Sequence, residues 1–388
     1  MRINSNVLRT AMPPLVELPR RAAVLAESGA DVIRVDQGAV DVAPPQAFVD
    51  GVVSALQDPE VHRYSPDPGL PELRSALALY AAQRLGVECD AERELIVTAG
   101  ANQGCFATLM ALVEPGDEVL LPSPWYFNHA MTLTALGAVP VAVPTSAEEG
   151  FVPTPDVVGG LITPRTRGLV LVNPNNPTGA CYGDDLVRRL VDLAIARDLW
   201  ILSDQTYHEL HYGAEAPLSP AAVPGARDRV ITACSFSKSL GLAGWRLGFL
   251  AGPAHLLDEV LKIQDCSVIC AARAGQEGLL AALPYAIDHI ENVRGTLQDR
   301  RDRLVTSLCA AGLETFVEPA GSLFLLLRLP GDSDDMAFCH RLLEEQHVVA
   351  VPGSAFGPGG EGSIRLSFGA TAPARLDEVV HRIAGAMA

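Results

Sequence analysis

Residues 235–249 of the chain read Ser-Phe-Ser-Lys-Ser-Leu-Gly-Leu-Ala-Gly-Trp-Arg-Leu-Gly-Phe. This stretch sets one lysine, Lys238, among small and hydroxylic residues, with Arg246 eight residues later. The chain has only one other lysine, Lys262. A desolvated lysine can lose its proton and attack a carbonyl, which an arginine cannot do. Lys238 is therefore a candidate Schiff-base lysine. The alternative is a lysine whose ammonium extends into solvent from the end of a strand.

The composition indicates a compact globular protein. Of the 388 residues, 48% are hydrophobic and 19% are charged, which excludes a disordered chain. The formal charge of -17 argues against a nucleic-acid partner or an anionic membrane surface. No apolar run reaches the length of a membrane span, and residues 1–18 lack the apolar core of a signal peptide, so we expect a cytoplasmic protein. The eight cysteines form no paired CxxC units and predict no metal site.

From about residue 94, short apolar runs alternate with amphipathic helical patterns. The apolar runs occupy residues 95–97, 118–121, 168–172, 199–202 and 229–232. Helical spacing extends over residues 101–113 and 186–197. This alternation predicts an α/β fold with a mostly parallel sheet covered by helices on both faces. Ligands of such sheets bind beyond the carboxyl ends of the strands, and the polar motifs of this chain follow those ends.

The last third of the chain has a different character. Residues 285–311 form one long helical pattern, and strand-like runs then follow at residues 322–329, 348–351 and 363–368. We expect a large α/β domain over residues 46–284. A smaller α+β domain is expected to consist of residues 1–45, which include an N-terminal arm, and residues 285–388.

Two segments have the character of an anion site. The first consists of Gly100, Ala101 and Asn102. It lies between a predicted strand and a predicted helix, where free backbone N–H groups and the helix dipole attract an anion, although a tight turn there needs glycine in any case. The second consists of Ser235, Ser237 and Arg246, which flank the lysine and offer hydrogen bonds to a phosphate. For Arg246 alone, an ordinary surface arginine is the alternative.

Polar side chains also follow neighbouring predicted strands. Asp204 comes at the end of an apolar run, and a buried acid there must be paired or functional. Tyr207 lies three residues on, and Asn176 belongs to the loop after the preceding strand. A carboxylate, a phenol and an amide suit an aromatic heterocycle with a ring nitrogen and a phenolic oxygen. A helix cap for Asp204 and a plain turn for Asn176 are the alternatives. Tyr126 is suited either to stack on a ring or to fill the core.

Arg365 lies in an otherwise uncharged predicted strand, Ser-Ile-Arg-Leu-Ser, over residues 363–367. An arginine in such a strand is unusual unless it faces a carboxylate, which the guanidinium can bind in a bidentate manner. A structural buried ion pair is the alternative.

The order and spacing of these motifs resemble those of the class I/II aminotransferases, which are fold-type-I pyridoxal-phosphate (PLP) enzymes. The resemblance rests on the opening stretch and on Asn-Pro-Asn-Asn-Pro-Thr-Gly (173–179), Ser-Asp-Gln-Thr-Tyr (203–207) and Ile-Arg-Leu-Ser-Phe (364–368). It extends from about Val32 to the C-terminus. It implies a large domain with a mostly parallel seven-stranded sheet, a smaller α+β domain, bound pyridoxal 5'-phosphate, and a homodimer with shared active sites.

The resemblance also implies roles for individual residues. Lys238 matches the lysine that forms the internal aldimine and then serves as base and acid at the substrate's α-carbon. Asp204 matches the partner of the pyridinium nitrogen, and Asn176 and Tyr207 match the groups at the 3-oxygen of the ring. Tyr126 falls where the family stacks an aromatic ring on the cofactor.

The phosphate and substrate groups follow in the same way. The phosphate cup comprises Gly100, Ala101, Asn102, Ser235, Ser237 and Arg246. Tyr64 matches a tyrosine that the family donates across the dimer interface to the neighbouring phosphate. Arg365 matches the arginine that holds the substrate's α-carboxylate, with help from Asn176 and the backbone of Gly38.

The substrate pocket departs from the family pattern. Gln205 stands where relatives carry an acidic residue, and residues 38–42 lack the Gly-x-Pro-x-Phe form. Asn102 stands where the aspartate-type branch has a lysine that binds a second carboxylate, so a dicarboxylate substrate is disfavoured unless an arginine elsewhere replaces that lysine.

The expected function is a PLP-dependent aminotransferase that moves an amino group between an L-amino acid and a 2-oxo acid. The alternative is a PLP enzyme of the same fold that uses the α-carbanion for β- or γ-elimination, replacement or cyclisation of a hydroxylated amino acid. A non-catalytic regulator is a third reading. Intact Lys238 and Asp204 argue against it.

Overall fold

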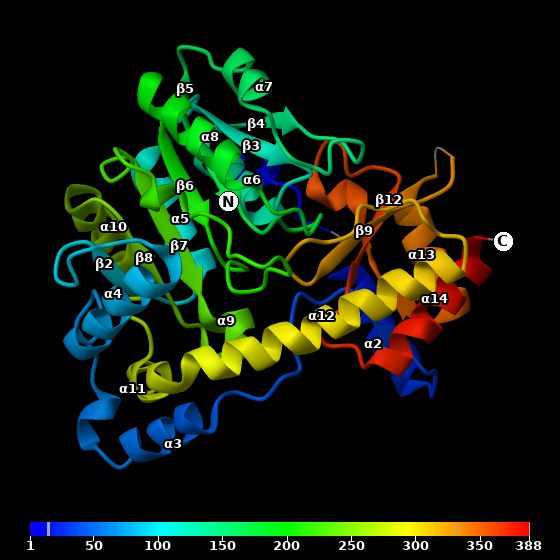
Figure 1. Cartoon of the computed structure of the whole chain (residues 1–388), viewed down its shortest axis with the longest axis horizontal. Coiled ribbons are helices and arrows are strands. Elements are labelled where there is room, and N and C mark those ends of the chain that lie inside the picture. Colours follow the sequence, from blue (N-terminus) through cyan, green and yellow to red (C-terminus); the bar gives the residue numbers. More distant parts are fainter. Residues whose placement is uncertain (14–15, 332, 388) are drawn as a thin grey trace.

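The computed structural model of the protein describes residues 1–13, 16–331 and 333–387. Residues 14–15, 332 and 388 fall within the predicted small domain and lie outside the described residues. The described chain contains a central sheet of seven strands and two smaller sheets of three and two strands. One helix, α12 (Ala286–Ala310), runs along both the central sheet and the smaller sheets (Figure 1).

The central sheet has the predicted mostly parallel character. Its strands are β2 (Leu95–Thr98), β3 (Glu118–Ser123), β4 (Val139–Pro144), β5 (Thr166–Val172), β6 (Trp200–Asp204), β7 (Val230–Ser235) and β8 (Gly248–Ala251). Their order across the sheet is β2-β8-β7-β6-β5-β3-β4. All neighbours are parallel except β8, which is antiparallel to β2 and β7. Because both faces are covered, the inner strands consist of aliphatic runs rather than of alternating polar and apolar residues.

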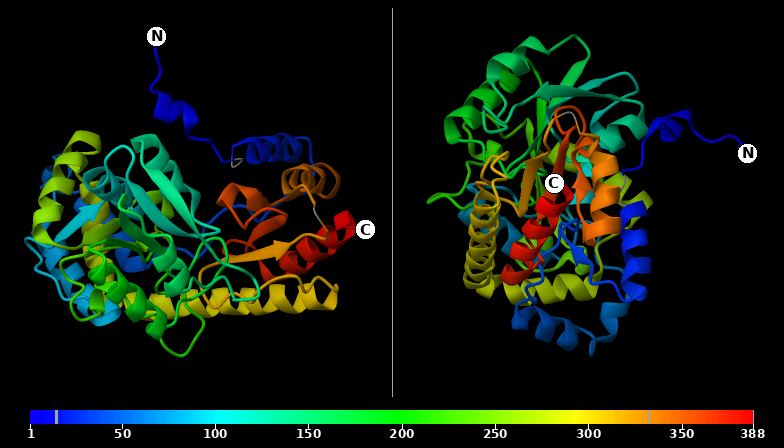
Figure 2. Two further views of the ribbon diagram at one scale, coloured as in Figure 1. Left: turned by 90° about the horizontal axis from the view of Figure 1, so that it is seen from above. Right: turned by 90° about the vertical axis from the view of Figure 1, so that its right-hand side faces the viewer.

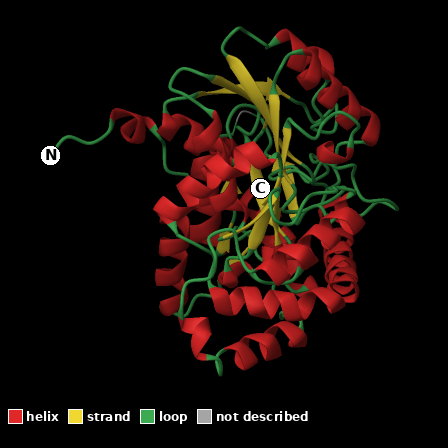
Figure 3. Ribbon diagram, turned by 90° about the vertical axis from the view of Figure 1, so that its left-hand side faces the viewer, coloured by secondary structure: helices red, strands yellow, loops and turns green. Residues whose placement is uncertain are grey.

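Helices lie on both faces of this sheet (Figure 3). Helices α5 (Ala101–Leu112), α6 (Phe127–Leu136) and α10 (Ala254–Ser267) share one apolar cluster with strand residues such as Leu202. Residues of the opposite face, such as Ile201, pack against α8 (Asp184–Ala196) and α7 (Pro155–Gly160). Helices α3 (Gln46–Ala55), α4 (Pro71–Leu85) and α11 (Arg273–Ala282) complete the cover beside β2 and β8.

The two smaller sheets join the start of the chain to its end. Strand β1 (Ile33–Arg34) pairs in parallel with β10 (Val348–Val349), and β12 (Ser363–Ser367) pairs antiparallel with β9 (Phe324–Arg328) and β11 (Val351–Pro352). Around them lie α2 (Glu17–Glu27), α13 (Asp335–Gln346) and α14 (Pro373–Met387). One apolar cluster holds Leu18, Ile33, Leu325 and Val379, so residues 17–35 fold onto the last third of the chain.

The remaining elements are short. They are α1 (Ser5–Arg9), α9 (Phe236–Ser239) and 3-10 turns at Pro59–His62, Pro220–Ala222, Ala243–Trp245, Leu283–Tyr285 and Gly353–Phe356. The N-terminal segment projects from the body of the molecule, and its helix α1 contacts α6 (Figure 2). Among the described helices, none combines the length and the apolar character needed to cross a membrane.

Three details of the sheets differ from the sequence-based prediction. The prediction omits β8 and also β4, whose sequence Val-Pro-Val-Ala-Val-Pro contains prolines. The structure places β4 at the edge of the central sheet, where a residue without an N–H is tolerated. The single strand predicted over residues 348–351 is two strands, because β10 pairs with β1 whereas β11 pairs with β12.

Candidate functional site

A cavity of about 510 Å³ lies at the carboxyl ends of the central strands. Its walls come from the ends of β6 and β7, from the start of α5, from β9 and β12, and from residues 36–39. It brings together most of the residues that the sequence singles out, namely Gly38, Ala101, Asn102, Tyr126, Asn176, Asp204, Tyr207, Ser235, Ser237, Lys238, Arg246 and Arg365. Gly100 lies directly beside the wall, and Tyr64 lies outside the cavity.

Lys238 is held in the short helix α9, directly after β7. Its amine donates a hydrogen bond to the backbone carbonyl of Gly38. Burial, together with the positive charges of Arg246 and Arg365, lowers the pKa of Lys238 from 10.5 to about 8. The pattern of small residues around this lysine thus produces a partly buried amine that can lose its proton near neutral pH.

Asp204 ends β6 and is buried, with 4% of its surface exposed. Nε2 of His129 lies 3.0 Å from its Oδ2, and the backbone N–H of Thr206 donates to Oδ1 at 3.0 Å. Burial alone would raise the pKa of Asp204, but the hydrogen bonds from His129 and Thr206 outweigh it and leave the pKa below its ordinary value. Asp204 is therefore a charged carboxylate in an enclosed place.

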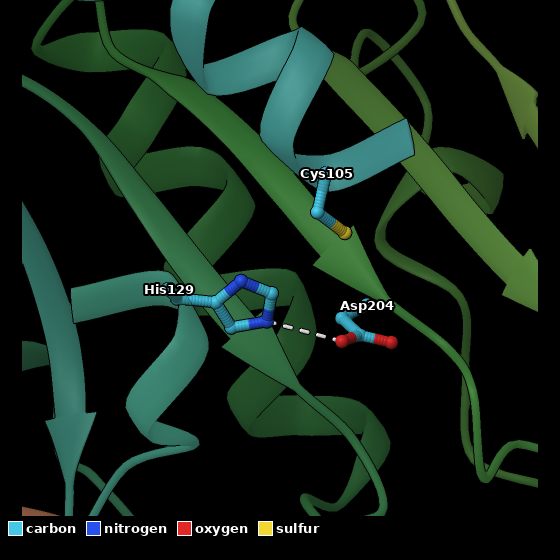
Figure 4. A group of neighbouring side chains, drawn as sticks. All are labelled: Cys105, His129 and Asp204. Atoms are coloured by element: carbon cyan, nitrogen blue, oxygen red, sulfur yellow. Dashed lines mark hydrogen bonds and ion pairs between the residues drawn. The ribbon is translucent and has the colours of Figure 1, made fainter. Parts of the chain in front are cut away.

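Cys105 lies beside this pair, and Figure 4 shows it on α5, with His129 on α6 and Asp204 at the end of β6. The ligand atoms of the three side chains lie within 4.8 Å of one another, which is the spacing of a metal site. Burial raises the pKa of the Cys105 thiol well above its usual range. The hydrogen bond between His129 and Asp204 is the better account of this group.

Tyr207, Asn176 and Tyr126 line the middle of the cavity. Nδ2 of Asn176 donates to the Tyr207 hydroxyl at 3.4 Å. Burial raises the pKa of Tyr207, as do the nearby Tyr126 and Asp204, so the phenol keeps its proton as a donor. The Tyr126 ring packs edge-on against His129 with centroids 5.3 Å apart, next to the Asp204 carboxylate.

One end of the cavity is rich in hydrogen-bond donors. Ser235 caps α9 by accepting from the backbone N–H of Ser237 at 3.1 Å, and its hydroxyl donates to that of Ser237 at 2.9 Å. Nη1 of Arg246 lies 3.4 Å from the same Ser237 hydroxyl. Gly100 precedes α5 with φ +80°, and a Cβ there would lie 2.5 Å from Nη2 of Arg246. Any larger residue at position 100 would therefore displace the guanidinium.

Arg365 forms the other end. It is 4% exposed and donates from Nη1 to Oδ1 of Asn176 at 3.1 Å and from Nη2 to the backbone oxygen of Asp36 at 2.6 Å. Its guanidinium lies 4.2 Å from the ring centroid of Phe324. Burial lowers the pKa of Arg365 to about 10. The Nε atom has no hydrogen-bond partner among the described residues, which is unusual for a buried guanidinium and leaves a donor free for an anion.

Tyr64 is 77% exposed and follows the 3-10 turn at Pro59–His62. It contributes nothing to the cavity of its own chain. This position is compatible with the predicted role across a dimer interface, in which Tyr64 would serve a second copy of the chain.

The sequence-based prediction missed several residues of the site. His129 follows Tyr126 by three residues at the start of α6, and this i, i+3 spacing was an available signal that both face the same place. Phe324, Arg34 and Asp36 gave no such signal, because their positions depend on the docking of the chain's first 40 residues onto its last third.

Polar contacts also fix the loop that carries Tyr207. Glu209 accepts from the Tyr80 hydroxyl at 2.7 Å and from Nη2 of Arg84 at 2.6 Å, both on α4. Gln205 donates from Nε2 to the Ser219 hydroxyl at 2.7 Å. Gln205, which departs from the family pattern, thus forms a structural contact within the protein.

Comparison with known proteins identifies the relatives of this site. The family model for aminotransferase class I and II matches residues 30–383. The chain is 36% identical to an aspartate aminotransferase of Thermotoga maritima over 95% of this chain and 94% of that protein. It is 34% identical to an arginine–pyruvate transaminase of Pseudomonas aeruginosa over 89% of this chain and 88% of that protein. A solved structure of Thermus thermophilus aspartate aminotransferase with maleate superposes with a TM-score of 0.93, at 32% identity and full coverage of both chains.

The lowered pKa of Lys238 predicts an unusual pH dependence of its reactivity. Competitive acetylation of the cofactor-free protein with trace acetic anhydride, read by peptide mass spectrometry, should show that acetylation of Lys238 rises with a midpoint near pH 8. Lys262, whose side chain is 69% exposed, is the only other lysine and serves as the internal comparison. A midpoint for Lys238 near the ordinary value of 10.5 would contradict the burial argument.

Proposed function

The chain belongs to the class I and II aminotransferases, PLP-dependent enzymes that move amino groups between amino acids and 2-oxo acids, and we propose that Lys238 carries the cofactor in the cavity described above. One observation carries this proposal. A single cavity contains an amine with a lowered pKa, a buried carboxylate and a buried guanidinium. A reaction at the α-carbon of an amino acid needs these three groups.

The donor set fits pyridoxal phosphate. Ser235, Ser237 and Arg246, with the N-terminal N–H groups of α5, offer donors and positive charge to a phosphate. At the other end, the free Nε of Arg365 is a donor for a carboxylate. Asp204 is the acidic side chain at the middle of the cavity, where a protonated ring nitrogen would need an anionic partner.

The roles of the residues follow from their contacts. PLP, when bound, accepts the electron pair that the departing α-proton leaves on the substrate. Asp204 is charged and would hold the proton of the ring nitrogen, and the hydrogen bond with His129 fixes the orientation of this carboxylate. The Lys238 amine, with its pKa near 8, is suited to take the proton from the substrate's α-carbon and to return it. Asn176 and Tyr207, which form a hydrogen bond with each other, would orient the ring through its phenolic oxygen.

Arg365 is proposed to bind the α-carboxylate of the substrate, together with Asn176 and the backbone of Gly38. Asn176 and the backbone of Asp36 accept from two of its terminal donors. These contacts concern the α-carboxylate and do not define the side chain of the substrate. Relatives at similar identity carry the names of aspartate and arginine aminotransferases, so the shared fold leaves the side-chain preference to the individual cavity wall.

We also propose that two copies of the chain share their sites, with Tyr64 of each copy reaching the phosphate of the other. The exposure of Tyr64 supports this proposal, because a phenol held outside its own cavity is free to enter another. The domain boundaries at residues 45/46 and 284/285 and the cytoplasmic location stay predictions.

Transamination is tested by a single turnover. Protein loaded with PLP and mixed with an amino-acid donor, but with no acceptor, should release one 2-oxo acid per Lys238 and then stop. The variant Lys238→Ala should release it about 10²–10⁴-fold more slowly, since it lacks the base at the α-carbon. Continuous release of ammonia, or loss of water from the donor, would point instead to elimination or cyclisation.

The shared site predicts complementation between two inactive variants. The homodimers of Lys238→Ala and of Tyr64→Ala should each have impaired activity. A mixed dimer of the two variants contains one site with both native residues. Coexpression with two affinity tags isolates that mixed dimer. Its activity per dimer should recover to about half that of the wild type. No recovery above the Tyr64→Ala homodimer would show that Tyr64 does not act across an interface.

A further inference from the structure

One charged pair in the cavity has no role in the chemistry above. Of the described residues that line the cavity, those with charged side chains are Arg34, Asp36, Asp204, Lys238, Arg246 and Arg365. The last four have been assigned to the cofactor and the α-carboxylate. Arg34 and Asp36 remain, and they bind each other in a bidentate manner. Nε of Arg34 donates to Oδ1 of Asp36 at 2.6 Å, and Nη2 donates to Oδ2 at 2.7 Å.

This pair adjoins the place where an amino acid would bind. The backbone oxygen of Asp36 accepts from Nη2 of Arg365 at 2.6 Å, and the backbone oxygen of Gly38 accepts from the Lys238 amine. Residues 36–38 therefore form the wall between the guanidinium that binds the α-carboxylate and the amine that acts at the α-carbon. A substrate side chain that runs along this wall meets Asp36 and Arg34.

The two partners differ in their access to water. The side chain of Asp36 is 5% exposed, whereas that of Arg34 is 33% exposed. If a ligand drew Arg34 away, a buried carboxylate would lose the ion pair that it forms among the described residues, at a high cost in free energy. If a ligand cation replaced Arg34 on Asp36, the carboxylate would stay paired and the displaced guanidinium could be hydrated at its exposed position. The pair thus accepts an incoming cation more readily than an incoming anion.

We propose that Asp36 recognises the side chain of the amino-acid substrate, and that this side chain bears a guanidinium or ammonium group, for which Arg34 stands in when no substrate is bound. This inference rests on the proposed function and names the substrate class of the same site. A second carboxylate on the substrate would find no cation in the cavity that is free of another partner or role. Asn102, at the phosphate end, adds no charge.

Ligands that cannot react test the proposal by binding alone. Isothermal titration of the PLP-loaded protein should compare ω-guanidino-alkanoates, from guanidinoacetate to 5-guanidinopentanoate, with unsubstituted alkanoates and with dicarboxylates of matched length. Each probe presents a carboxylate to Arg365, and the probes differ in the charge at the far end. The guanidino series should contain a member that binds about tenfold or more tightly than its neutral counterpart, whereas the dicarboxylates should bind no better than the neutral acids.

Two variants separate recognition from a general effect on the fold. In Asp36→Asn, the preference for the guanidino ligand should fall to about unity. In Arg34→Gln, the unbalanced charge of Asp36 should weaken the binding of neutral acids near Arg365, while guanidino ligands should bind at least as tightly as in the wild type. The ratio between the two classes should therefore widen. Glu344→Gln is the matched control, because Glu344 forms a comparable bidentate pair with Arg21 on the surface, outside the cavity.

A wild-type preference for dicarboxylates, or a guanidino preference that persists in Asp36→Asn, would overturn the proposal. These outcomes differ from a failure of the proposed function. A protein that shows the Asp36-dependent preference but releases no 2-oxo acid from any donor would refute transamination and leave the recognition of a cation standing. Release of 2-oxo acid without any cation preference would refute the recognition of a cation and leave transamination standing.

Discussion

The site depends on the burial of one amine among other cations. Among the described residues, Lys238 forms no ion pair with a carboxylate. Its hydrogen bond goes to a backbone carbonyl, and its charged neighbours are Arg246 and Arg365. Lowering the pKa from 10.5 to about 8 costs the folded protein about 3 kcal/mol at neutral pH, because one pKa unit corresponds to about 1.4 kcal/mol. The burial that destabilises the folded protein also yields a nucleophilic amine.

Anions that enter the cavity would offset its excess of positive charge. The cavity contains three further cationic side chains and two carboxylates, and one of those carboxylates, Asp36, is already neutralised by Arg34. A phosphate at Arg246 and a carboxylate at Arg365 would therefore bring in the missing negative charge. The site is thus electrostatically incomplete in a way that matches its proposed ligands.

The segment of residues 36–38 connects the two parts of the molecule at this site. Its carbonyls accept hydrogen bonds from Arg365, which comes from the three-stranded sheet, and from Lys238, which follows the central sheet. The segment itself continues from β1, which pairs with β10. One short segment therefore contacts both the guanidinium of Arg365 and the amine of Lys238.

Sequence patterns predicted the features that depend on residues close together in the chain. Lys238, Asp204 and Asn176 each follow an apolar strand within a recognisable motif, so both the sheet and these residues could be predicted. Contacts between segments that are far apart in the sequence could not be predicted in this way. His129 and Asp204 are 75 residues apart, and Asp36 and Arg365 are 329 residues apart. Composition also misleads at β4, whose prolines suit an edge strand that only the complete sheet defines.

The most direct test of this account locates the cofactor on the chain. PLP-loaded protein, reduced with borohydride and digested, should carry one phosphopyridoxyl group per chain, attached to Lys238 and absent from Lys262. Attachment at Lys262, or a cofactor that borohydride leaves removable by dialysis, would contradict the assignment of Lys238 as the residue around which the cavity is built.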